Sequence, residues 1–537
     1  MTGIRLYAQS GCRKRWHQTL STPAQRQGGQ AMVFVSVTAL IVLLALLAMY
    51  STGQLSTEKM KLQNTADAVA YSAALTQARD LNFSAYMNRA MIANQVALAQ
   101  VVSMTGWARN FDDTFNGRNA SIAKSLARMS SLSALWLVPA RAYGTIGKGL
   151  SKGFDVTSPI AVKALNVLID ILRSSSIAYH FAMAATLPQT VSDVMHANDA
   201  RAALSPAGTL GAARGVLEHL RFVSLYEPSR NRDGAQRFAN VVDASSDRFY
   251  KNRTALDGVW PTPMLIDPVR LFQPGVGPIL MFNFHRGGST MREQSMQDYT
   301  SADSSGLFVM FCVTFSFFGI PIPIPFPLPP MPAGAGAAAA GNFPSNILTR
   351  TGSGYVEHRN ADNDAIDPNA RRDYGDAYRN QFTRLSYAVQ ARRGPGNNLD
   401  ARTGLRSYLD LKDNAVGARS NEANNDETFN HHNDQAPAFV IELERDARSI
   451  ATSSSPSFRI GNLSNSGAKS LRLSDATAGQ KIRAMAKAEA YFARSPFARS
   501  DEKSEHGSLY SPYWQARLLP NSLPEQAAAA LAQISGL

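Results

Sequence analysis

The sequence predicts an α+β protein: an N-terminal transmembrane helix, a membrane-proximal helical subdomain, and a mixed α/β or mostly β external domain with long loops. Three observations predict this class. Residues 31–50 are apolar and hold no charge. Alanine-rich sequence with helical spacing follows them, and from about residue 206 glycine and proline become frequent while apolar runs shorten. We expect a basic leader at 1–30, a membrane helix at 31–50, a helical subdomain at 51–205 and the mixed domain at 206–537.

The apolar run Ala31–Tyr50 has the length of a single membrane span, because a helix needs about 20 apolar residues to cross hydrocarbon. The first acidic residue of the chain is Glu58. The basic residues before the run are Arg5, Arg13, Lys14, Arg15 and Arg26. Since Lys and Arg favour the cytoplasmic side, we expect the N-terminus inside and the bulk of the chain outside. The alternative is a cleaved signal peptide, for which Ala45, Ala48 and Ser51 make a poor site.

Composition and charge limit the classes of partner that we expect. The chain has 537 residues and a formal net charge of +13. Outside the leader the basic residues form no run, so nucleic acid is not expected as a partner. On the predicted topology Cys12 and Cys312 lie on opposite sides of the membrane, so the external part is held by packing without a disulfide.

The stretch Leu55–Met104 is predicted to be helical because it has no proline and is rich in alanine. Apolar residues of one face recur at helical spacing: Leu62, Ala66, Val69, Ala70 and Ala73. Ala66, Ala70 and Ala74 form a small-residue ridge that allows close helix approach. We expect the membrane helix and the Leu62–Ala74 helix to contact sister subunits. The alternative is a plain amphipathic core helix. Asp80 and Asn82 are expected to mark a cap or kink in this stretch.

Two motifs that flank the apolar run give a family resemblance. The run is entered through Arg26–Ala31 (Arg-Gln-Gly-Gly-Gln-Ala) and followed by Leu62–Ala70 (Leu-Gln-Asn-Thr-Ala-Asp-Ala-Val-Ala). This combination resembles the TadE/TadG-like N-terminal region of TadG-like proteins of the Flp/Tad (tight adherence) pilus-assembly system. It covers about a tenth of the chain. The residues that carry the resemblance, and that we expect to pack helices, are Gly29, Gln30, Ala31, Leu62, Gln63, Asn64, Ala66, Asp67 and Ala70.

Two departures from that system refine the expectation. Pilin-like subunits need a glutamate five residues after the prepilin cleavage point, where this chain has Phe34 or Val33. Many TadG-like proteins carry a von Willebrand factor A domain with an Asp-x-Ser-x-Ser metal site, and the nearest segment, Asp243–Asp247, lacks the final Ser. We therefore expect an anchored accessory protein instead of a polymerising pilin, and no metal site.

The resemblance implies a function by binding. We expect a single-pass protein of the bacterial inner membrane whose periplasmic domain is an accessory or scaffold in Flp/Tad pilus assembly or secretion. Its partners would be the lipid bilayer, other pilus-assembly membrane subunits, and a pilin or outer-envelope component. The alternatives are a membrane-tethered periplasmic hydrolase of unrecognised type and a general envelope structural protein.

No catalytic motif supports the hydrolase. The sequence has no Gly-x-Ser-x-Gly elbow, no His-Glu-x-x-His and no cysteine pair for zinc, so neither catalysis nor a cofactor is expected. His431–Asp434 is the local cluster of metal-ligand types, and we expect a solvated loop there. Gly352–Asp434 as a whole is polar and expected to be partly mobile.

The remaining elements follow from periodicity and from breakers. Helices are expected at 118–137 and 158–197, with breaks near Gly144–Gly153, and a short helix at Ile482–Ala493. The expected strands are Pro263–Ile266, Gly277–Phe284, Leu307–Phe318 and Ala438–Leu443.

A Pro-rich apolar insert occupies residues 319–344. Because alternating proline blocks a helix and cannot donate to a strand ladder, we expect polyproline II geometry from Pro321 to Pro330. Three interpretations stay open: a buried strand leading into an apolar arm, an arm that docks on a partner or dips into the bilayer surface, and a second membrane span. Ala333–Gly341 is expected to be a flexible linker.

Aromatic residues cluster near the C-terminus, in Ser508–Leu518. One interpretation is a plug that locks the end of the chain into the core. The other is a docking ledge, because Trp, Tyr and Arg dominate interface energies. The docking candidates are Tyr510, Pro512, Tyr513, Trp514 and Arg517.

Overall fold

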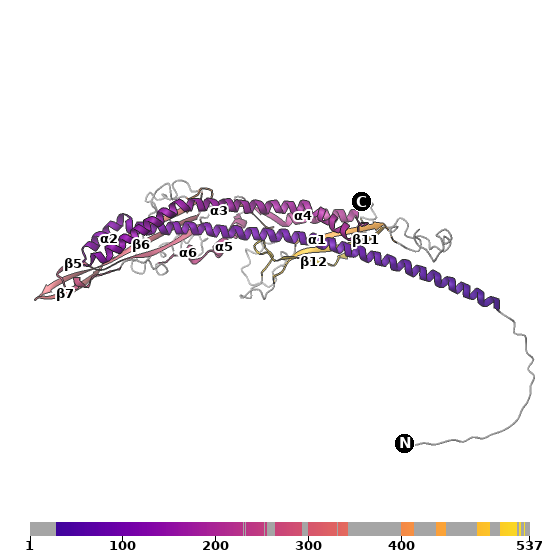
Figure 1. The fold of residues 1–537 in the computed structure, drawn as a ribbon, viewed down its shortest axis with the longest axis horizontal. Coiled ribbons are helices and arrows are strands. Elements are labelled where there is room, and N and C mark those ends of the chain that lie inside the picture. The colour runs from indigo at the N-terminus through magenta and orange to yellow at the C-terminus, as the bar shows by residue number, and fades with distance from the viewer. Residues whose placement is uncertain are drawn as a thin grey trace, which may run out of the picture. The chain divides into compact units, whose positions relative to one another are not determined.

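A computed structural model describes residues 28–228, 230, 232–251, 253–254, 264–292, 299–329, 331–341, 399–412, 436–446, 450, 481–494, 505–523, 526–527 and 531 (Figure 1). Long helices are followed by a β-rich region, so the predicted α+β class is confirmed. The chain forms two compact units. The first comprises Met1–Asn64, Arg201–Ala203 and Leu443–Ala484, and the second comprises Thr65–Ala200, Leu204–Glu442 and Met485–Leu537.

Three helices come first: α1 (Gly28–Asn116), α2 (Arg118–Arg128) and α3 (Ser133–Asn198). No proline lies between Pro23 and Pro139, which lets α1 continue for 89 residues. The predicted break at Gly144–Gly153 is wrong, because α3 runs through it. Two of its glycines lie where α3 meets α1: an added Cβ would lie 2.7 Å from Asn116 Oδ1 at Gly144 and 3.0 Å from a ring carbon of Phe111 at Gly147.

Shorter elements follow along the chain. The helical ones are α4 (Pro206–Phe222), α5 (Arg232–Ser245), α6 (Arg248–Lys251) and the 3-10 helix η1 (Pro268–Leu271). The strands are β1 (Ala203–Leu204), β2 (Val223–Tyr226), β3 (Arg253–Thr254), β4 (Leu265–Ile266), β5 (Gly275–Arg292), β6 (Tyr299–Phe317), β7 (Ile320–Pro327), β8 (Met331–Ala340), β9 (Tyr408–Leu411), β10 (Phe439–Asp446), β11 (Lys481–Phe492) and β12 (Trp514–Leu519).

The strands form three sheets. The largest has the order β3-β5-β6-β7, with β4 also on β5 and β8 also on β6. The others have the orders β2-β9 and β1-β10-β11-β12. All four predicted strands overlap strands of the structure, namely β4, β5, β6 and β10. The predicted loop cluster His431–Asp434 and most of Gly352–Asp434 lie outside the described residues.

Three segments differ from their predicted structure. Residues 320–327 form the edge strand β7 on β6 instead of a polyproline II helix. The expected flexible linker is the buried strand β8, which pairs with β6. The predicted helix at 482–493 is the strand β11, where Ala484, Ala486, Ala488 and Ala490 are buried at every second position.

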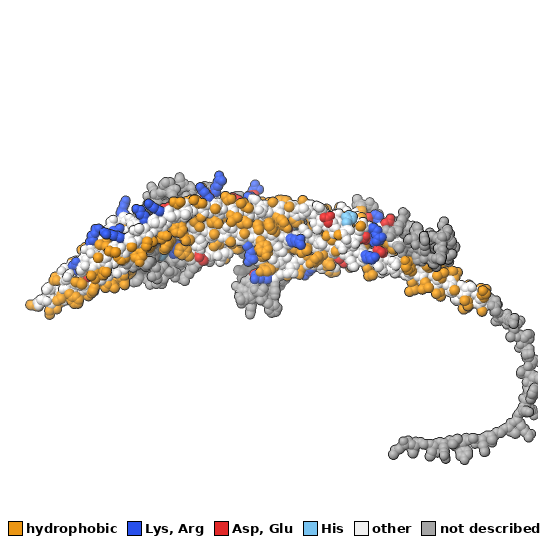
Figure 2. Space-filling model, in the orientation of Figure 1, with side chains coloured by type: hydrophobic (Ala, Val, Ile, Leu, Met, Phe, Trp, Pro, Cys, Tyr) orange, Lys and Arg blue, Asp and Glu red, His pale blue; other side chains and the backbone are white. Residues whose placement is uncertain are grey.

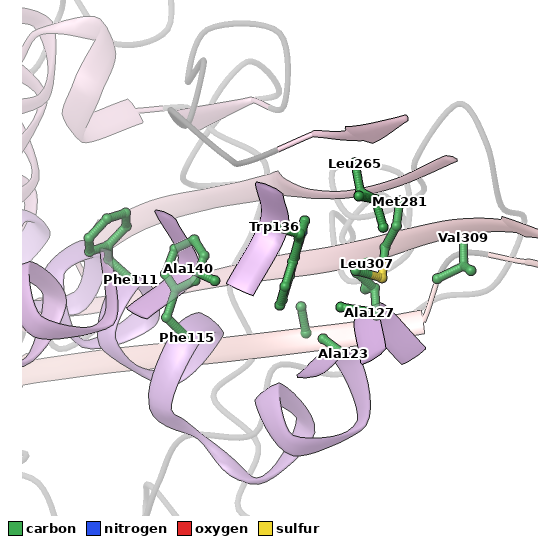
Figure 3. Packing of buried hydrophobic residues seen from close by; sticks show 11 residues of the cluster. Phe111, Phe115, Ala123, Ala127, Trp136, Ala140, Leu265, Met281, Leu307 and Val309 are labelled. Carbon is green, nitrogen blue, oxygen red and sulfur yellow. The ribbon is translucent and has the colours of Figure 1, made fainter. Parts of the chain in front are cut away.

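One hydrophobic cluster of the second unit lies between helices and the large sheet (Figure 3). The indole of Trp136 in α3 lies between the phenyl rings of α1 and the aliphatic side chains of the strands. The buried members of the cluster are Phe111, Phe115, Ala123, Ala127, Trp136, Ala140, Leu265, Met281, Leu307, Val309 and Ala333. This packing holds α1, α2 and α3 against β5, β6 and β8.

Candidate functional site

The most unusual feature of α1 is a buried polar face. Eight polar side chains on it are at most 1 % exposed. They are Gln77, Asp80, Ser84, Asn88, Gln95, Ser103, Asn110 and Thr114. Their spacing of three, four, seven or eight residues places them on one side of the helix. Since burial of a polar group is unfavourable unless it is hydrogen-bonded, the partners of this polar face define its role.

The partners are segments far along the chain. Nδ2 of Asn88 donates to the carbonyl oxygens of Leu409 and Leu509, at 2.8 Å each. Nε2 of Gln95 donates to the carbonyl oxygen of Gly404 at 2.9 Å. Thr114 exchanges a hydroxyl hydrogen bond with Ser305 of β6. The polar face therefore binds backbone and hydroxyl groups of strands and loops that the chain places against α1.

Asn82 makes a similar contact beside the polar face. Its Nδ2 donates to the carbonyl oxygen of Trp514 at 2.8 Å, and its Oδ1 accepts from the Trp514 N–H at 2.9 Å. The amide thus satisfies both backbone groups of the first residue of β12. The predicted cap at Asp80 or Asn82 is wrong, because α1 is unbroken there and both side chains bind distant segments instead.

Asp80 forms a buried cluster with two histidines. Its Oδ2 accepts hydrogen bonds from Nδ1 of His180 in α3 at 2.6 Å and from Nε2 of His219 in α4 at 2.9 Å. Burial alone would raise the pKa of Asp80, but the hydrogen bonds from the two imidazoles outweigh it and hold that pKa below its usual value. The cluster therefore keeps an ionised carboxylate between three helices.

The same three residues are the group, among the described residues, that could hold a metal ion, since their ligand atoms lie within 4.8 Å of one another. One ring nitrogen of each histidine is hydrogen-bonded to Asp80 Oδ2, so the three side chains hold one another in place. The three side chains are at most 4 % exposed, so the cluster lies in the interior of the described structure. Sequence reasoning missed the cluster because His180 and His219 lie 100 and 139 positions from Asp80.

A second buried cluster joins strands of the large sheet. Arg253 of β3 donates from Nε and Nη2 to the two carboxylate oxygens of Asp303 in β6, at 2.7 and 2.8 Å. Nε2 of His285 in β5 lies 3.2 Å from Asp303 Oδ1. Burial would raise the pKa of Asp303, and the charge of Arg253 together with the His285 hydrogen bond lowers it below its usual value. The cluster is a closed polar link across three strands.

The predicted signature residues occupy different environments. Leu62, Ala66 and Ala70 are fully buried, Gln63 and Asp67 are half-buried. Asn64 and Ala31 are exposed, and Gly29 and Gln30 lie in the first turn of α1. The small-residue ridge is therefore covered within the chain. Contact of the Leu62–Ala74 helix with sister subunits stays a prediction.

The first part of α1 is, among the described residues, the helix that is long and apolar enough to cross a membrane. Its large side chains are exposed, Phe34 at 70 % for example. The hydroxyls of Ser36 and Thr38 donate to carbonyl oxygens of their own helix, so they leave no unpaired polar group in the apolar run.

The first acidic residue, Glu58, forms an ion pair in the first unit. Its Oε2 lies 2.7 Å from Nη1 of Arg445, whose side chain is buried. Burial would raise the pKa of Glu58, but hydrogen bonds from Lys61 and Arg445 lower it below its usual value. The ion pair fastens α1 to β10 next to the apolar run.

The predicted docking residues lie in and around β12. Trp514 is buried, and its ring packs against Phe222 and Phe492. The half-buried Tyr510 and Tyr513 also contact rings of the chain, while Pro512 lies between them and is half-buried. Nε of Arg517 donates to Glu489 at 2.7 Å. Docking of a partner on this segment stays a prediction.

These features define a class of protein: an α+β chain in which a candidate membrane helix continues into a helix with a buried polar face. Residues 29–78 match the Tad family model, described as putative Flp pilus-assembly TadE/G-like. This match confirms the resemblance found from the two flanking motifs, and it supports involvement in Flp/Tad pilus assembly. Together with the apolar helix it indicates a membrane-anchored protein. No curated protein and no solved structure matches the chain.

Proposed function

We propose that the protein is an anchored accessory or scaffold component of Flp/Tad-type pilus assembly or secretion, which acts by binding other proteins. The match of residues 29–78 to the TadE/G-like model carries this proposal. The N-terminus would be cytoplasmic and the bulk of the chain periplasmic, in the bacterial inner membrane, with other assembly subunits and a pilin or outer-envelope component as partners.

Two observations favour binding over catalysis. The His- and Asp-containing clusters at Asp80 and Asp303 are closed to solvent and link helices or strands to one another. The exposed part of the TadE/G-like segment includes Met60, Asn64 and Tyr71, which offer apolar and amide groups suited to a protein surface. The polar face of α1 supports the scaffold role, because it fixes the register of the segments packed on the helix.

Deletion of the gene tests the proposal. We expect loss of surface pili, measured in the sheared fraction, and its return with the full chain. A photo-crosslinking amino acid at the exposed Asn64 should capture another membrane subunit of the pilus system. The same amino acid at Tyr86, which is exposed on α1 outside the matched segment, is the matched control.

Normal piliation of the deletion strain would refute the pilus role. The topology has its own readout in the complemented strain. An impermeant maleimide should label Leu210→Cys in intact spheroplasts and should reach Cys12 only after permeabilisation. The reverse labelling pattern would overturn the predicted orientation. The pilus role would still be decided by the piliation of the deletion strain.

A further inference from the structure

The turn between β6 and β7 is a charge-free projection of the large sheet. Strand β5 begins at Gly275, which pairs with Thr314, so the sheet has two strands beyond that point. The last pair before the turn is Phe317 with Ile320. We call residues 315–322 the β6–β7 tip. No charged residue occurs between Asp303 and Arg350.

One face of this hairpin is apolar throughout, and among the described residues it is exposed near the turn. Cross-strand pairs place aromatic and branched side chains side by side on it. The pairs are Phe311 with Phe326, Val313 with Ile324, Phe315 with Ile322, and Phe317 with Ile320. All of them except Phe311 and Val313 are exposed, and Phe318 in the turn is 99 % exposed. Figure 2 shows orange side chains around the position of β7.

The free edge of β7 has no N–H donors. In an antiparallel strand the N–H and C=O of every second residue point away from the partner strand. A proline cannot donate to the ladder, so the four prolines of β7 take the outward positions. They are Pro321, Pro323, Pro325 and Pro327. Because strand addition needs N–H donors as well as acceptors along the edge, a second copy could not extend the sheet here.

Backbone geometry at the turn also points to a role for the exposed ring. Phe318 has φ +50° and Gly319 has φ +82°, in a two-residue turn. Asparagine or glycine is the favoured residue at the first of these positions, and a bulky side chain there is strained. The chain thus keeps a fully exposed phenylalanine where turn geometry favours another residue.

Basic helices pack on the sheet behind the tip. Between Asp113 and Asp155 the chain has no acidic residue. The basic residues of that stretch are Arg118, Lys124, Arg128, Arg141, Lys148 and Lys152, which lie on α2 and the first part of α3. Figure 1 places α2 beside β5 and β6, and Figure 2 shows blue side chains over it. Positive charge behind an apolar projection is the pattern that anionic lipid headgroups attract.

We propose that the β6–β7 tip inserts into one leaflet of an anionic lipid bilayer, with the basic side chains of α2 and α3 at its headgroups. The three residues from Phe315 to Phe317, which form the β6 side of the tip, extend about 10 Å along the strand. Hydrocarbon is about 30 Å thick, so the hairpin enters a leaflet and does not span the bilayer. The proposal rests on the tip's own chemistry and is independent of the pilus role.

A fluorescent probe on the tip tests the insertion. The full chain, with Cys12→Ser and Cys312→Ala, would carry an NBD label on Ser316→Cys, an exposed position that keeps every aromatic ring. The protein is held in a nanodisc through its apolar helix and mixed with vesicles of phosphatidylcholine and phosphatidylglycerol. We expect a blue shift of NBD emission and quenching by doxyl lipid. Quencher placed only in the nanodisc, or only in the vesicles, identifies which bilayer receives the tip.

Matched variants make the test specific. Phe317 and Leu210 of α4 are both 63 % exposed. Phe317→Asp should weaken insertion on the order of a hundredfold, and Leu210→Asp should leave it unchanged. Vesicles of phosphatidylcholine alone should bind less. The proposal would be overturned if NBD emission stays unshifted and is still quenched by iodide from water, whether the doxyl lipid is in the nanodisc or in the vesicles. Insertion that is unchanged by Phe317→Asp would also overturn it. So would a blue shift of NBD emission that a co-purified protein causes in the absence of lipid.

Discussion

Phe318 shows how far a single residue can depart from the preference of its backbone position. Its φ of +50° lies in the left-handed region, which bulky side chains rarely occupy. The adjacent Gly319 meets its own positive φ without strain. This residue is disfavoured by the turn and is almost fully exposed, which agrees with the proposed contact of its ring with lipid.

Phe318→Asn should separate stability from membrane insertion. Asparagine accepts a positive φ and precedes glycine in type I′ turns, so we expect the hairpin to gain about 1 kcal/mol. Slower amide hydrogen exchange in β6 and β7 would measure the gain. The same variant should insert more weakly into vesicles. Unchanged or faster exchange would show that the turn is not strained.

Asp80 and Asn82 mark the limit of sequence reasoning at the scale of the residue. Polar residues in an apolar helix pattern suggest a cap, since that is the common use of Asp and Asn. Here the partners are His180, His219 and the backbone of Trp514, which lies 432 positions away from Asn82. Nothing local in the sequence identifies such partners. The helical spacing of the polar residues, however, is present in the sequence and could have indicated the polar face.

At the scale of the element, β8 owes its position to the absence of side chains. A Cβ on Gly336 would lie 2.1 Å from the backbone nitrogen of Asn110 and 2.3 Å from the carbonyl oxygen of Gly106. At Gly334 it would lie 2.5 Å from the backbone nitrogen of Thr114. The strand therefore touches the backbone of α1 directly, which only glycine permits.

Gly336→Ala should force β8 away from α1. Overpacking of this kind costs about 1–3 kcal/mol, so we expect a lower midpoint of chemical unfolding and faster proteolysis within β8. Gly149→Ala is the matched control, because a Cβ there meets nothing within 4 Å in the middle of α3. That control should stabilise the protein by about 0.5–1 kcal/mol. Equal effects of the two variants would contradict the close approach.

The elements that sequence patterns predicted well are those whose own periodicity decides their structure. The helical face at Leu62–Ala73 and the strand within β6 are examples. The predictions that were wrong concern segments in which contact with another element outweighs the local sequence pattern. Small residues in β8 and in the middle of α3 resemble a linker or a break, yet they allow contact with α1. In β11 the alternation of alanine with longer residues was a strand signal that alanine content obscured.

At the scale of the whole molecule, the second unit is organised by contacts that are remote in sequence. The polar face of α1 binds residues of β5, β6, the Gly404 loop, and the segment before β12. The hydrogen bonds within a helix are local, whereas these contacts of the polar face join residues that lie 187–421 positions apart. Folding of the unit should therefore be slow for a helix-rich chain.

Asn82→Ala should test how much the unit depends on its last strand. The substitution leaves the N–H and C=O of Trp514 without their side-chain partner, and we expect a loss of about 2 kcal/mol. Urea unfolding followed by Trp fluorescence would measure it. Asn64→Ala removes an exposed amide from the same helix and should change the midpoint by less than about 0.5 kcal/mol. Similar shifts of the unfolding midpoint for both variants would show that the hydrogen bonds from Asn82 to Trp514 do not stabilise β12.

The proline edge of β7 has a further consequence during biosynthesis. A newly made chain that displays Phe315, Phe317 and Phe318 carries a segment with the composition of an aggregation nucleus. Stacking into cross-β fibrils needs donors along the strand, and β7 withholds them at every second residue. Other nascent chains therefore meet no N–H donors along the outward edge of β7, which disfavours strand addition at that edge.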